Sequence, residues 1–63
     1  MCESKVILKG KKGTTEVMPE AAKITVEEGK ITVYDLRGSK KTLDNCKLKD
    51  IDFIKHVTTL ESK

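Results

Sequence analysis

The chain has 63 residues, of which 37% are hydrophobic and 37% charged, and a net charge of +3. This length predicts a single domain over residues 1–63 with a small core, since chains this short bury only about 60% of their unfolded surface. Two cysteines are too few for a disulfide scaffold, and neither a secretory signal nor a membrane-spanning run is visible. We therefore expect a cytoplasmic domain that oligomerisation or a metal helps to stabilise.

Alternation of hydrophobic and polar residues predicts strands along the N-terminal half of the chain. The first strand covers residues 2–9, and two glycines enclose a polar turn over residues 10–13. Residues 14–18 predict a short second strand, which Pro19 should end or confine to a sheet edge. Two alternating runs then flank Gly29 and predict a hairpin with a tight turn.

The C-terminal half predicts further short strands. A turn over residues 37–40 leads into a strand over residues 40–44, and residues 45–50 are expected to be irregular, with at most one helical turn. Ile51 and Phe53 alternate with polar residues, and a last strand is expected over residues 54–60, which include His56. Five or six short strands joined by glycine-marked turns are typical of a small all-β antiparallel barrel or sandwich.

The strongest chemical signal is a cysteine at position two. The Met1 amine, the Cys2 amide nitrogen and the Cys2 thiolate close two fused five-membered chelate rings around one metal ion. If Met1 is removed, the Cys2 amine and thiolate form one ring and the Glu3 amide nitrogen closes the second. A planar set of nitrogen and thiolate donors suits Ni(II) or Cu(II). The alternative is that Cys2 is a chance residue on a frayed end.

A second copy of the chain would supply the donors that one Cys2 lacks. A symmetric dimer brings the same patch of both copies together across a two-fold axis. Two thiolates and backbone nitrogens would then complete a four-coordinate, nearly planar site. The first strand is apolar on both faces, at Val6 and Leu8 on one and at Ile7 on the other, which leaves apolar surface for a partner.

The remaining candidates have simpler explanations. No catalytic arrangement is visible, because the one histidine, His56, has no evident partner, and we expect a non-enzyme. Cys46 is expected to behave as a small buried hydrophobe. Asp50 and Asp52 are expected on a solvated face. A small barrel with positive charge also suggests binding of RNA or single-stranded nucleic acid, but the chain has only two aromatic residues for base stacking.

Three segments together resemble a known family over essentially the whole length. They are the Met1-Cys2 start running into residues 5–8, the hairpin over residues 26–33, and the C-terminal residues 51–53 with 57–60. The chain resembles the CooT family, which consists of small nickel-binding accessory proteins of carbon monoxide dehydrogenase maturation. Apart from Cys2, these motifs are shared by many small β-barrels.

The resemblance implies an SH3-like or Sm-like barrel that forms a homodimer and holds one Ni(II) through paired Cys2 residues. It implies nickel supply to carbon monoxide dehydrogenase or its maturation machinery, with Met1 and Glu3 contributing backbone nitrogens only. Cys46 departs from the family, which has an apolar residue there in the member compared. The ranked hypotheses are a nickel-binding accessory protein, a nucleic-acid-binding Sm- or OB-like barrel, and an interaction module without a ligand.

Overall fold

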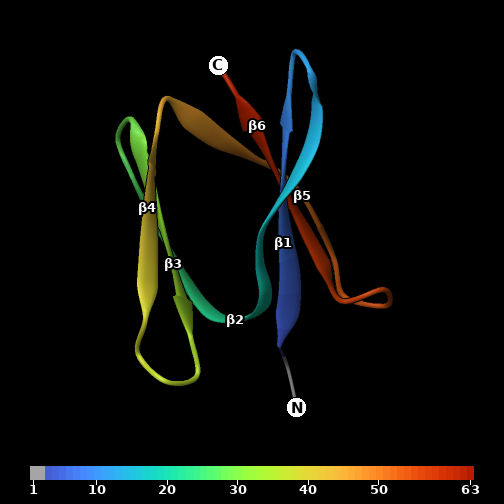
Figure 1. The fold of residues 1–63 in the computed structure, drawn as a ribbon, viewed down its shortest axis with the longest axis vertical. Coiled ribbons are helices and arrows are strands. Elements are labelled where there is room, and N and C mark those ends of the chain that lie inside the picture. Colours follow the sequence, from blue (N-terminus) through green and yellow to red (C-terminus); the bar gives the residue numbers. More distant parts are fainter. Residues whose placement is uncertain (1–2) are drawn as a thin grey trace.

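A computed structural model describes residues 3–63, in which six strands form one sheet. The strands are β1 (Ser4–Gly10), β2 (Gly13–Glu27), β3 (Lys30–Asp35), β4 (Lys40–Asp44), β5 (Cys46–Asp52) and β6 (Val57–Ser62). Their order across the sheet is β4-β3-β2-β1-β6-β5 (Figure 1). The predicted all-β class is confirmed.

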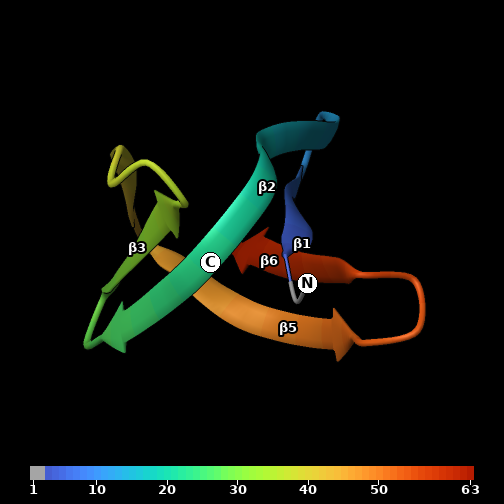
Figure 2. The same cartoon turned by 90° about the horizontal axis from the view of Figure 1, so that it is seen from below.

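The sheet differs in two ways from the closed antiparallel barrel that the sequence predicted. It is not closed, because β4 and β5 lie at its two edges. The pair β1–β6 is parallel, with Lys5 opposite Val57 and Lys9 opposite Glu61. All other neighbouring strands in the sheet pair in antiparallel fashion. The sheet is strongly coiled instead, so that β5 crosses close to β3 without hydrogen-bonding to it as a neighbouring strand (Figure 2).

The core lies inside this coiled sheet. Four side chains from three strands, Val6, Ile31, Val33 and Leu60, are completely buried. They pack with a second set of buried residues: Val17, Met18, Ala21 and Cys46. Because the parallel pair joins the first strand to the last, residues from both ends of the chain meet in one cluster.

β2 is one long strand, contrary to the prediction that Pro19 ends it or sits on an edge. It pairs with β1 from Gly13 to Ala21 and with β3 from Ala21 onward. Pro19 lies between Met18 and Ala21, where the register with β1 shifts. Proline lacks an N–H donor and is tolerated at such bulges, so it bends the strand without ending it.

β5 was also missed, because residues 45–50 were expected to be irregular. Only Asn45 departs from strand geometry, with a φ of 55°, and it joins β4 directly to β5. The pairing of β5 with β6 shifts register between Leu48 and Asp50. That shift, together with four charged residues in the strand, hides the alternation that normally marks a strand.

The glycine turns and the last strand are partly as predicted. Gly29 and Gly38 have φ values of 75° and 92°, which explains a glycine in each turn. His56 does not lie in the last strand: it ends the turn between β5 and β6, with a φ of 56°. Within residues 3–63, no helix is long and apolar enough to cross a membrane.

Candidate metal centre and the adjoining groove

The start of β1 fixes where the predicted metal ligands are attached. Met1 and Cys2 lie outside the described residues, and Glu3 is a half-buried residue immediately before β1. The hydroxyl groups of Ser4 and Thr58 share a 2.9 Å hydrogen bond. The Lys5 amide donates a 2.8 Å hydrogen bond to the carbonyl oxygen of His56. The chain is therefore held firmly at its first two strand residues.

β1 is an interior strand of the sheet, between β2 and β6. Ser4 pairs with Ala21 on one side, and Lys5 pairs with Val57 on the other. Interior strands open less readily than loops and edges, because more contacts must break. Cys2 lies two residues before Ser4 in the sequence, outside the described residues.

Cys46 is a poor candidate for a metal ligand. Its side chain is 6% exposed within the core, and its thiol donates a 3.3 Å hydrogen bond to the carbonyl oxygen of Asp44. The prediction that Cys46 is a small buried hydrophobe is therefore confirmed. Because the sequence contains only two cysteines, a thiolate ligand for a metal from solution would have to be Cys2.

Other side chains do not form an evident metal site in the described part of the chain. Among residues 3–63, no three His, Cys, Asp or Glu residues are grouped so that they could hold a metal ion. The carboxylate of Asp52 accepts hydrogen bonds from the amides of Ile54 (3.0 Å) and Lys55 (2.9 Å), which is a turn-stabilising role. Asp50 is exposed, as predicted.

A groove adjoins the point where the N-terminal residues leave the fold. It encloses about 370 Å³ and has a mostly apolar surface. Its walls come from four parts of the chain: residues 3–4, residues 21–24, residues 51–53, and the pair His56 and Thr58. The sequence did not predict this groove, because its walls meet through the β1–β2, β1–β6 and β5–β6 pairings. The one feature of the sequence that pointed to a groove was the presence of three large apolar residues among polar neighbours, namely Ile51, Phe53 and Ile54.

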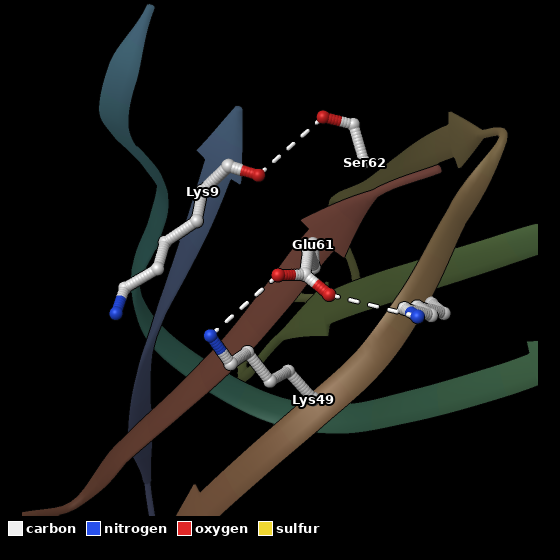
Figure 3. Close-up of polar contacts among 5 residues, drawn as sticks. Lys9, Lys49, Glu61 and Ser62 are labelled. Atoms are coloured by element: carbon white, nitrogen blue, oxygen red, sulfur yellow. Dashed lines mark hydrogen bonds and ion pairs between the residues drawn. The ribbon is translucent and has the colours of Figure 1, made fainter. Parts of the chain in front are cut away.

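The surface around β6 bears on the nucleic-acid alternative. Glu61 lies between two lysines, with 3.7 Å to the ammonium of Lys47 and 3.5 Å to that of Lys49 (Figure 3). The nearby Ser62 hydroxyl donates a 3.4 Å hydrogen bond to the Lys9 carbonyl oxygen. Positive charge here is thus interrupted by a carboxylate, whereas binders of nucleic acid need continuous positive surface along the phosphates.

The two aromatic residues do not form a base-stacking platform. Tyr34 lies in β3, with the ammonium of Lys23 5.1 Å from its ring centre, whereas Phe53 lies in the turn after β5. Nucleic-acid-binding β-sheets typically stack successive bases on neighbouring aromatic side chains. The arrangement of Tyr34 and Phe53 gives no support to this alternative.

Comparisons with known proteins agree with the fold and identify a family. A crystal structure from Carboxydothermus hydrogenoformans, assigned to CooT, superposes with a TM-score of 0.84 over 98% of both chains at 18% identity. At that identity, the likeness shows a common fold. A search of curated proteins finds no significant match. The sequence model for CO dehydrogenase accessory protein CooT matches residues 1–61, and the chain therefore belongs to the CooT family.

Proposed function

We propose that this protein is a nickel-binding accessory protein that supplies Ni(II) for the maturation of carbon monoxide dehydrogenase. The observation that carries the proposal is the match of residues 1–61 to an accessory-protein family of that enzyme. Cys2 provides the chemistry, because thiolate and nitrogen donors suit Ni(II). Nickel is the cargo of this protein, which acts in the cytoplasm and not as an enzyme.

The proposed site is formed by two copies of the chain. Each copy contributes the Cys2 thiolate, and backbone nitrogens near Met1 and Glu3 complete a four-coordinate set. The burial of Cys46 supports this assignment, since it leaves Cys2 as the thiol for a metal from solution. The anchoring of Ser4 and Lys5 also supports it, because a rigid attachment lowers the entropy lost when two N-termini are brought together.

A titration of the reduced protein with Ni(II) tests this proposal. The wild-type protein should develop thiolate-to-nickel charge-transfer absorbance that saturates at one nickel per two chains, and it should elute as a dimer in size exclusion. Cys2→Ser should lose the absorbance and bind nickel at least a hundredfold more weakly, because a hydroxyl replaces the thiolate. Cys46→Ser is the matched control, and its nickel stoichiometry and absorbance should match the wild type.

The outcomes separate the parts of the proposal. Saturation at one nickel per chain would keep nickel binding but contradict the shared site. Unchanged nickel affinity in Cys2→Ser would contradict the assignment of the ligand. Absence of binding in the wild-type protein would reject nickel supply altogether.

A further inference from the structure

β4 forms one margin of the sheet and, in the described part of the chain, pairs with β3 alone (Figure 1). Its register with β3 runs through all five residues without a shift. A regular edge strand presents a row of unpaired backbone N–H and C=O groups, with which a strand of another molecule can pair. Folded proteins protect such edges, so β4 is expected to carry a feature that keeps other strands away.

The opposite margin, β5, has clear protection. Four of its seven residues are charged, and its pairing with β6 shifts register between Leu48 and Asp50. Its lysines Lys47 and Lys49 both contact Glu61 (Figure 3). Charged side chains and bulges both discourage edge-to-edge pairing. Since β4 has no such register shift with β3, its backbone is the more regular of the two edges.

One lysine of β4 lies on the face of the sheet that covers the core. Lys41 is directly opposite Val33, just as Leu43 is opposite Ile31. Residues directly opposite each other in an antiparallel pair share a face, and both Val33 and Ile31 are 0% exposed. Leu43 packs against the same core. This edge strand therefore has a charged side chain where the alternation of a half-buried strand normally places an apolar one.

The ammonium of Lys41 is bound by a strand that β4 does not pair with. Its Nζ donates a 2.9 Å, partly buried hydrogen bond to the carbonyl oxygen of Val17 in β2. Val17 lies at a register shift of the β1–β2 pair, between Glu16 and Met18. The extra residue of a bulge is left out of the regular ladder, and β3 pairs with β2 only from Ala21 onward. Lys41 thus supplies a donor where the ladder is interrupted.

This hydrogen bond, called the β4 latch below, has two physical consequences. Moving β4 away from β2 breaks a hydrogen bond to a charged donor, which contributes more than one between neutral groups. A strand added beside β4 would extend the core-covering face past Lys41 and remove water from its partly buried ammonium. Burying a charge further is costly, and inward-pointing charged residues are one known means of protecting an edge.

We propose that Lys41 protects the free edge of this sheet: the β4 latch holds the edge strand against β2 and prevents it from pairing with a strand of another molecule. Association of this chain is thereby confined to surfaces other than the β4 edge. The inference is independent of the proposed function, because it involves neither Cys2 nor nickel.

Lys41→Met tests the protection of the edge, because methionine keeps a flexible aliphatic side chain but removes the charge and the donor. Sedimentation velocity is recorded over a concentration series with reduced protein and a metal chelator. The variant should form species larger than those of the wild type at concentrations at least about tenfold lower. Lys40→Met is the matched control, since it removes the same charge from the neighbouring position, which faces away from the core. It should sediment as the wild type does.

Hydrogen exchange of backbone amides, followed by NMR in dilute protein, measures the β4 latch itself. In Lys41→Met, the β4 amides that pair with β3 should exchange at least about tenfold faster than in the wild type, and the β6 amides should change less. Lys41→Arg keeps a charged donor and should restore the protection of β4 to within about threefold of the wild type. An equal change in β4 and β6 would indicate a loss of global stability alone and would contradict the latch.

A measurement on the wild-type protein tests the inference even where Lys41→Met does not fold. The folded protein is treated with limiting acetic anhydride, and fragment ions in mass spectrometry separate the products at Lys40 and Lys41. The Lys41 amine should react at least about fivefold more slowly, because its hydrogen bond to Val17 must first break. Equal reactivity would overturn the latch. Unchanged sedimentation of folded Lys41→Met, or equally strong association of Lys40→Met, would overturn its role in protecting the edge.

Discussion

At the scale of single residues, two non-glycine positions adopt left-handed backbone conformations among the described residues. Asn45 and His56 have φ values of 55° and 56°. Both lie where a connection must change direction abruptly: Asn45 between β4 and β5, and His56 between the turn and β6. Both residue types are enriched in this conformation, but the short side chain of asparagine can also hydrogen-bond locally to support it, which the longer histidine side chain does less readily.

His56→Gly is therefore expected to stabilise the fold. The left-handed conformation costs an L-residue roughly 1–2 kcal/mol, and glycine removes that cost but loses about 0.5–1 kcal/mol through the greater freedom of its unfolded state. The net gain in the free energy of unfolding should be about 0.5–1 kcal/mol. Urea denaturation at one fixed protein concentration measures it.

Asn45→Gly is the matched control for His56→Gly, because its φ value is nearly the same. Its gain should be smaller, since asparagine tolerates the conformation better. Loss of stability in His56→Gly would show that the imidazole makes stabilising contacts in the groove, which it lines. The left-handed backbone would then not be the dominant effect at this position.

At the scale of elements, the parallel pair β1–β6 is the connection on which the candidate site depends. It joins residue 5 to residue 57, which are far apart in the sequence, so no local turn brings the two strands together. Near the start of this pair, the Ser4 and Thr58 hydroxyl groups share a hydrogen bond. Thr58 is 2% exposed, so this hydrogen bond is largely shielded from water.

A double-mutant cycle of Ser4→Ala and Thr58→Val measures that hydrogen bond. The coupling free energy should be about 0.5–1.5 kcal/mol, as for neutral hydrogen bonds in other proteins. Chemical denaturation of the four proteins gives the value. The Thr32 and Thr42 hydroxyl groups are 3.3 Å apart and provide a comparison, with a smaller coupling expected from Thr32→Val and Thr42→Val. Equal coupling in both cycles would contradict this account.

Local patterns predicted the local elements well. The hairpin around Gly29 and the turn at Gly38 were predictable, because each couples two alternating runs to a residue suited to positive φ. The full length of β2 was not predictable, because Pro19 ends a strand unless a bulge accommodates its missing N–H donor. β5 was missed because a register shift interrupts its alternation, and tertiary pairing with β6 decides its conformation.

The candidate site, like the fold, could be predicted from the sequence only in part. The position of Cys2 predicts a metal ligand, and this role stays a prediction because Cys2 lies outside the described residues. Burial of Cys46 was predictable from the usual behaviour of free cysteines. The groove was not, because its walls come from segments whose proximity depends on the parallel pairing of β1 with β6.

At the scale of the whole molecule, the core is small. Four side chains are completely buried in a chain of 63 residues. Domains of this size bury a low fraction of their surface and have little stability to spare. A ligand that binds only the folded dimer adds stability by mass action, so the proposed nickel site would also stabilise the fold.

Nickel should therefore raise the melting temperature of the reduced protein. Free nickel at a hundredfold excess over the dissociation constant contributes about 2.7 kcal/mol per binding event, which a dimer shares between two chains. Since 1 kcal/mol shifts the Tm of a domain this small by roughly 4–8 °C, we expect an increase of about 5–10 °C. Differential scanning calorimetry with and without Ni(II) measures it. Cys2→Ser should show no increase, and an equal increase in that variant would mean that nickel stabilises the fold at another position.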